Sequence, residues 1–192
     1  MKHRKAALLV QLQKELAPGE IRFDAPTIEA HAGDKWFATH LPDAVALPRS
    51  SGAVARILRF AAKHRIPVTA RGAGHGYVGG CVPAHAGLVL SLARMNRIKE
   101  IHADDFVAVV QAGVITQKLQ KAVEKKGLYY PPDPASRANC TIGGNIASTV
   151  LDAEFDYEKE MAELGIGVLS TLQSSFEDSG RGGDASPESL DD

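Results

Sequence analysis

Three short apolar stretches mark the first half of the chain, at residues 44–48, 66–72 and 87–92. The third is continuously apolar, which is typical of a strand covered on both faces. Between the first two stretches, apolar residues recur at helical spacing behind Ser50 and Ser51, either of which suits a helix N-cap. These helical positions are Val54, Ile57, Leu58, Ala61 and Ala62. The pattern predicts a strand, a helix and two further strands.

The next segment predicts a hairpin and a second helix. Apolar residues fall on both sides of a polar turn at 103–105, as in a hairpin over 98–111. Thr116 is expected to cap a helix, and Gly127 is expected to end it in a left-handed conformation. Three residues of this helix face inward: Leu119, Ala122 and Val123. The proline-rich stretch 128–136, "LYYPPDPAS", is expected to be extended, because residues before proline avoid the helical region.

The two ends of the chain differ in character. The start, "MKHRKAALLVQLQKEL", predicts an amphipathic helix, because polar residues interrupt its apolar patch and no cleavage site for a signal peptide follows. Residues 1–150 hold 20 Lys and Arg against 11 Asp and Glu, whereas residues 151–192 hold 2 against 12. The acidic end is rich in Ser, Gly and Asp. We expect a short helix followed by disorder over 149–192.

Five glycines lie within nine residues of "VTARGAGHGYVGGCVP", at 72, 74, 76, 79 and 80. Part of this stretch matches the dinucleotide fingerprint G-x-G-x-x-G, but Pro83 and a strand follow where that fold needs a helix. A P-loop is excluded because no Gly-Lys-Ser/Thr follows. Bare peptide amides in such a loop can form a concave site for an anion. Arg71 would add charge or brace the turn.

A second glycine turn, "TIGGN" at 141–145, follows the rigid "PPDP". Two such loops would grip a diphosphate from opposite sides. The alternative is that each is a turn that binds nothing.

The order of these elements, with the "TARGAG" loop, "YPPDP" and "CTIGGNIA", resembles the FAD-binding domain of the vanillyl-alcohol oxidase superfamily. It is most similar to the FAD-linked oxidase branch of the glycolate oxidase flavin subunit and D-lactate dehydrogenases. The resemblance covers roughly residues 20–148. It implies an α+β fold with a small, mainly parallel sheet and helices in the first lobe, antiparallel strands in a second lobe, and FAD between them.

The resemblance also implies which residues touch FAD. In the first loop, backbone amides would hold the pyrophosphate, and the residues concerned are Arg71, Gly72, Ala73, Gly74, His75, Gly76 and Tyr77. Further residues would lie along the pyrophosphate and near the isoalloxazine ring. These are Pro132, Asp133, Thr141, Ile142, Gly143, Gly144 and Asn145.

His75 has two interpretations. It donates a hydrogen bond to a phosphate oxygen, or it is bonded covalently to the flavin 8α-methyl as in some relatives; the first is favoured. Cys140 lies near a second attachment position of some relatives, but its spacing favours a small buried thiol. Cys81 and Cys140 form no metal motif, so no metal site is expected.

The sequence therefore predicts a helix and lead-in over 1–40, an incomplete FAD-binding domain over 41–148 with its second lobe truncated, and an acidic tail over 149–192. The function it indicates is the FAD-binding portion of a cytoplasmic flavin-dependent oxidoreductase. Its small-molecule substrate would be a 2-hydroxy acid such as glycolate or D-lactate. The alternatives are a non-catalytic remnant, or a subunit whose missing C-terminal half comes from a partner chain. No nucleic acid, no membrane span and no identifiable catalytic residue are expected.

Overall fold

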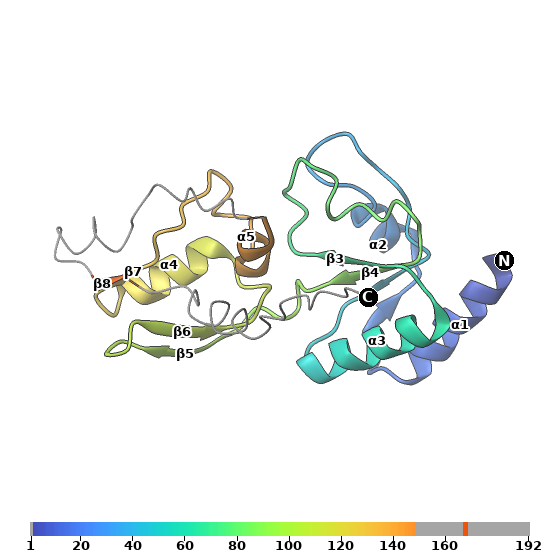
Figure 1. Cartoon of the computed structure of the whole chain (residues 1–192), viewed down its shortest axis with the longest axis horizontal. Coiled ribbons are helices and arrows are strands. Elements are labelled where there is room, and N and C mark those ends of the chain that lie inside the picture. Colours follow the sequence, from blue (N-terminus) through green and yellow to red (C-terminus); the bar gives the residue numbers. More distant parts are fainter. Residues whose placement is uncertain (1, 149–166, 169–192) are drawn as a thin grey trace, which may run out of the picture.

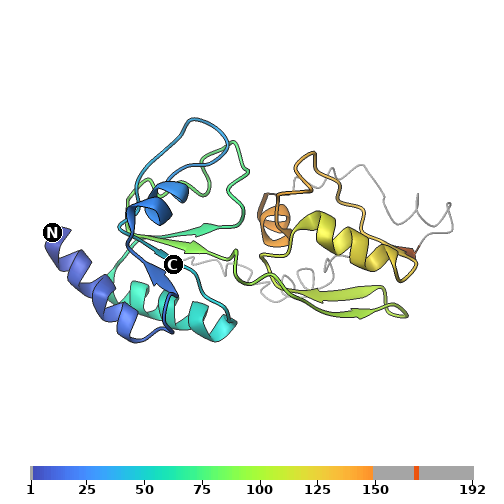
Figure 2. The ribbon, with the colours of Figure 1, turned by 180° about the vertical axis from the view of Figure 1, so that it is seen from behind.

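The computed structural model describes residues 2–148 and 167–168 and divides them into two lobes (Figures 1 and 2). The first lobe comprises α1 (Lys2–Lys14), β1 (Ile21–Arg22), α2 (Ala25–Ala30), β2 (Ala44–Ala46), α3 (Ser51–His64), β3 (Val68–Arg71) and β4 (Leu88–Ser91). The second comprises β5 (Ile98–His102), β6 (Val107–Val110), α4 (Thr116–Glu124), β7 (Leu128–Tyr129) and α5 (Ile142–Ser148), with β8 (Gly167–Val168) parallel to β7. The fold is α+β, as the sequence predicts.

A four-stranded sheet in the order β1-β2-β4-β3 forms the first lobe. Strands β2, β3 and β4 are parallel and β1 is antiparallel, so the sheet is mainly parallel as predicted. All of β2 and β4 is buried, which explains why every residue of these strands except Ser91 is apolar. Because β2, β3 and β4 are parallel, their carboxyl ends meet at one edge, where the loop after β3 begins.

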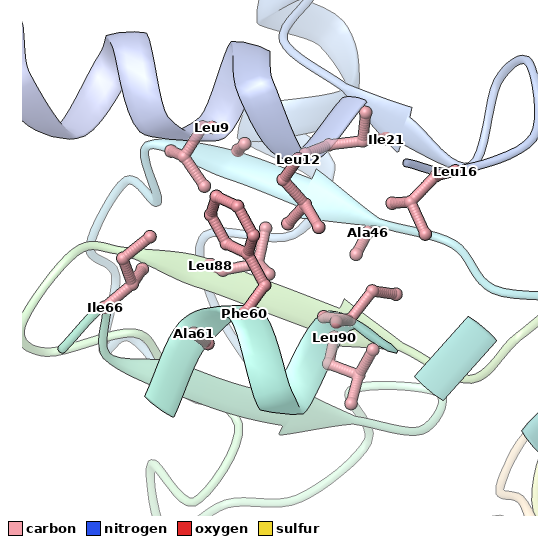
Figure 3. Packing of buried hydrophobic residues seen from close by; sticks show 12 residues of the cluster. Leu9, Leu12, Leu16, Ile21, Ala46, Phe60, Ala61, Ile66, Leu88 and Leu90 are labelled. Atoms are coloured by element: carbon pink, nitrogen blue, oxygen red, sulfur yellow. The ribbon is translucent and has the colours of Figure 1, made fainter. Parts of the chain in front are cut away.

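Helices α1 and α3 lie side by side on one side of this sheet, and α2 lies on the other (Figures 1 and 2). Ser50 begins α3 by accepting a hydrogen bond from the Ala53 amide, and Arg65 ends it in a left-handed conformation. In the core, Phe60 of α3 packs with Leu9 and Leu12 of α1 over the strands (Figure 3). Each fully buried side chain of this size contributes about 1.5–3 kcal/mol.

The second lobe packs the β5–β6 hairpin and α4 around its own core. The buried members of this core are Val114, Leu119, Val123, Leu128, Tyr130 and Ile142. Gly127 has the predicted left-handed conformation, with a φ of 74°, but it does not cap α4, which ends at Glu124 with Lys125 as its C-cap. The predicted hairpin is also confirmed.

Two further local predictions are wrong. Thr116 does not cap α4, because it is the first helical residue and the N-cap, Ile115, makes no side-chain capping bond. The second glycine segment is not a simple turn either, because residues from Ile142 onward form α5. The sequence pattern also missed the short elements β1 and α2. The predicted helix and disorder beyond residue 148 lie outside the described residues, apart from the two residues of β8.

Candidate functional site

A loop whose first amides make no backbone hydrogen bond follows β3 at the carboxyl edge of the parallel strands. Among the described residues, none accepts a hydrogen bond from the seven backbone amides of residues 72–78. Residues 72–75 are half-buried, and residues 76–78 are exposed. Because no described protein group accepts from these amides, the loop offers a row of free donors to the acceptor of a ligand. A concave row of such donors suits an anion.

Arg71 braces this loop from within. Its guanidinium donates to the carbonyl oxygens of Gly33 and Ala30 and lies 3.3 Å from the Cys81 sulfur. Gly74 has a φ of 71°, and a Cβ on it would collide with the Arg71 guanidinium. Arg71 therefore fixes the shape of the loop and keeps a positive charge directly beneath it.

The segment before β2 holds the far end of the loop. The Lys35 amide donates to the Gly76 carbonyl at 3.1 Å, and the Gly79 amide donates to the Asp34 carboxylate at 2.9 Å. Figures 1 and 2 show this segment and the loop after β3 side by side at one end of the first lobe. Sequence reasoning missed this contact, because Asp34 and Gly79 are 45 positions apart and no local motif marks Asp34.

The two glycine segments meet between the lobes. A Cβ on Gly72 would come within 2.5 Å of the Thr141 hydroxyl and 3.9 Å of the Gly144 Cα. The position therefore has room only for glycine as the structure stands. The contact brings the first loop of the predicted site against the second.

The second segment differs from the first, because its amides are already paired. Ile142 donates to the Val114 carbonyl, Gly143 to the Ala112 carbonyl, and Gly144 to the Thr141 hydroxyl, which caps α5. Asn145 donates from its amide to the Thr141 carbonyl and from its side chain to the Thr116 hydroxyl. Residues 141–145 therefore lie beside the loop with the amides of 142–145 already hydrogen-bonded, and they offer no row of free donors.

Pro132 and Asp133 lie on the extended segment of the second lobe. The Pro132 carbonyl accepts a hydrogen bond from the Gln120 side chain. Asp133 forms an ion pair with Arg137, whose Nη1 lies 2.7 Å from one carboxylate oxygen and 2.6 Å from the other. This pairing lowers the pKa of the Asp133 carboxyl. The Asp133 carboxylate is exposed and remains ionised at neutral pH.

His75 lies in the middle of the loop, with Nδ1 at 3.3 Å from the Ala73 carbonyl. A carbonyl oxygen only accepts, so this contact places the proton on Nδ1 and leaves Nε2 as the basic nitrogen of the neutral ring. Both roles of His75 remain predictions. Cys140, by contrast, is buried, with its sulfur 3.1 Å from the Thr116 hydroxyl, which agrees with the interpretation as a buried thiol.

Burial also raises the pKa of Tyr130, which lies in the core of the second lobe. Residues 2–148 and 167–168 contain no group of three or more His, Cys, Asp or Glu placed to hold a metal ion. In that same part of the chain, every helix falls short of the length or apolar character needed to cross a membrane.

Comparison with known proteins agrees with this geometry. A family model described as an FAD binding domain matches residues 42–151. The glycolate oxidase subunit GlcD of Bacillus subtilis (strain 168) is 49% identical over 106 residues, which are 55% of this chain and 23% of that protein. D-2-hydroxyglutarate dehydrogenase of Stutzerimonas stutzeri (strain A1501) is 38% identical over 144 residues, 74% of this chain and 31% of that protein.

The chain thus spans less than a third of the length of these relatives. Among solved structures, alkyldihydroxyacetonephosphate synthase matches with a TM-score of 0.68 at 24% identity, over 73% of this chain and 31% of that one. This match supports the α+β fold of the lobes.

Proposed function

Because the chain belongs to the FAD-binding domain family, we propose that residues 72–78 hold the diphosphate of FAD. The observation that carries the proposal is the run of backbone amides at 72–78 that find no acceptor among the described residues. Two phosphate groups supply the acceptors that these donors lack. Preorganised amide donors bind an anion without a cost of rearrangement.

The surrounding residues fit such a ligand. The Arg71 guanidinium lies beneath the loop and adds positive potential to it, while its hydrogen bonds to Gly33 and Ala30 keep the loop in shape. The paired segment 141–145 would line the other side of the diphosphate through its surface rather than through free amides. His75 would donate a hydrogen bond to a phosphate oxygen after its ring turns away from Ala73, or would offer Nε2 to the flavin.

When bound, FAD would accept a hydride or electrons from the substrate, and the protein would supply the position and surroundings of the flavin. The relatives are named for glycolate and D-2-hydroxyglutarate, which are both 2-hydroxy acids. We therefore infer a role in the oxidation of a 2-hydroxy acid. The two lobes would bind the cofactor, and substrate selection would fall to the part of the relatives that this chain does not span.

An assembly of more than one chain is also part of the proposal, because one of the relatives is named as a subunit.

Gly76 offers a direct test of the loop. A Cβ on Gly76 meets no atom within 4 Å, and its φ is not positive, so Gly76→Val places a branched side chain on the loop without disturbing the fold. We expect this variant to weaken FAD binding by about tenfold or more, which corresponds to ~1.4 kcal/mol. FAD retained after dialysis is measured by absorbance near about 450 nm, the ordinary flavin band.

Gly80→Val is the matched control, since Gly80 also has open space around it and lies beyond the run of unpaired amides. It should retain as much FAD as the parent chain. Equal retention by the Gly76 and Gly80 variants would remove the loop from the site. A parent chain that retains no FAD would overturn the proposed function itself.

A further inference from the structure

A surface hollow lies where the chain crosses from the first lobe to the second (Figure 1). Its volume is about 400 Å³, within the range of small-molecule sites. One side of it comes from the loop after β2, and the rest comes from the linker between β4 and β5. The lining residues are Arg49, Ala93, Arg94, Asn96 and Arg97. We call this feature the linker hollow.

Three guanidinium groups line the linker hollow, and none of the ion pairs in the described part of the chain involves them. Arg94 is directed by a hydrogen bond of 2.9 Å to the Gly19 carbonyl. A further positive charge lies nearby, because the Lys118 ammonium donates to the Asn96 carbonyl at 3.4 Å. Like charges gathered at one place repel one another and raise the local concentration of counter-ions. The linker hollow therefore favours an anionic ligand.

The backbone on both sides of the linker hollow is fixed by buried polar groups. Glu20 is buried, and its carboxylate accepts from the Ala17 amide at 3.1 Å and from the Arg49 amide at 3.0 Å. Both of its oxygens thus bind backbone amides. On the side of the second lobe, the Arg97 amide donates to the buried Gln111 side chain at 3.0 Å. The first lobe anchors Arg49, and the second lobe anchors Arg97.

We propose that the linker hollow is a second anion site, sharing no lining residue with the loop 72–78, and that it takes a small phosphate-bearing molecule. All three charged lining residues are arginine. A guanidinium group presents a planar fork of N–H donors that matches two oxygens of a phosphate group. A compact ligand with more than one negative charge would contact Arg49 and Arg97 together. It would thereby bridge the two lobes at their linker.

Inorganic pyrophosphate is the probe, titrated into the ¹⁵N-labelled full chain. Amide NMR separates the two anion sites, because the signals of Ala93 and Asn96 report on the linker hollow and those of residues 72–78 report on the loop. We expect the Ala93 and Asn96 signals to shift, with a Kd that rises about tenfold or more in R49Q/R97Q. Both substituted side chains are exposed, so the fold should be kept, and circular dichroism checks this.

R56Q/R59Q is the matched control, because it removes the same charge from exposed positions on α3 outside the linker hollow. Its Kd at Ala93 and Asn96 should equal that of the parent. Equal weakening in both double variants would mean that net charge alone attracts the anion, and the inference would fail.

Two further results would overturn the inference. One is that saturating pyrophosphate leaves the Ala93 and Asn96 signals of the parent unshifted. The other is that R49Q/R97Q moves the signals of residues 169–192 before any ligand is added, because the acidic end of the chain would then be the occupant of the linker hollow. FAD retention is measured separately, so failure of the proposed function and failure of this inference are distinguishable.

Discussion

Arg71 fixes the conformation of the loop after β3 through hydrogen bonds to backbone carbonyls. Its guanidinium is engaged by backbone carbonyls of residues 30 and 33, which lie on a different segment of the chain. From the sequence, Gly74 reads as a position where a side chain would meet phosphate. In the structure, a side chain there meets Arg71 first and is also strained by the positive φ. Glycine at position 74 therefore leaves room for the Arg71 guanidinium. Gly76 is the position where a substitution tests whether a ligand occupies the space beside the loop.

His31, which lies near Arg71, makes the stability of the fold depend on pH. Burial lowers the pKa of His31 below its ordinary value of 6.5, and the nearby positive charge of Arg71 lowers it further. The folded chain thus holds His31 neutral while the unfolded chain takes up a proton more readily. We expect stability to fall as the pH drops through 6.5 towards the folded pKa, and to change no further below it.

The measurement is the urea midpoint of the parent and of His31→Asn between about pH 7.5 and pH 5. Asn can keep the hydrogen bond to the Thr27 carbonyl that Nδ1 of His31 makes. Since the other histidines are common to both proteins, the parent should lose more stability in acid than the variant. Parallel pH curves would show that His31 does not titrate as described.

At the scale of elements, the sequence predicted the parallel strands, α3, the hairpin and α4, because their apolar periodicity coincides with their burial. It failed at residues 142–148, where two glycines argued against a helix. The helix forms because tertiary packing outweighs helix propensity. A Cβ on Gly143 would lie 2.8 Å from the Ala112 Cβ, so the glycine permits close packing of α5 on the segment before α4.

Thr116 joins α4 to α5, and this role replaces the predicted cap. Its hydroxyl is fully buried, accepts from the Asn145 side chain at 2.7 Å and lies 3.1 Å from the Cys140 sulfur. We expect Thr116→Val to destabilise the fold by about 1 kcal/mol, because the hydrogen bond between the half-buried Asn145 side chain and the buried Thr116 hydroxyl is lost while the shape is conserved.

Thr116→Ser keeps the hydroxyl and should lose only part of this stability, through the missing methyl group. Denaturant unfolding of both variants gives the comparison. If Val were tolerated better than Ser, packing rather than the hydroxyl would hold the two helices together.

At the scale of the whole molecule, the candidate site depends on contacts that no local pattern encodes. The order of the two glycine segments could be read from the sequence, and their approach at Gly72 and Thr141 agrees with the expected arrangement of the lobes. The pairing of residues 34–36 with the loop could not be read, because it joins positions more than 40 residues apart. The paired state of the amides in 141–145 also follows from tertiary structure alone.

The central claim is that the unpaired amides of residues 72–78 receive the diphosphate of FAD. Amide NMR spectra of the ¹⁵N-labelled full chain, recorded with and without FAD and with ADP as a diphosphate probe, test it residue by residue. We predict that both ligands shift the amide protons of this loop towards the hydrogen-bonded range. The already paired amides of Gly143 and Gly144 should move less. Saturating FAD that leaves the amides of 72–78 unshifted, or shifts those of 142–145 instead, would contradict the account.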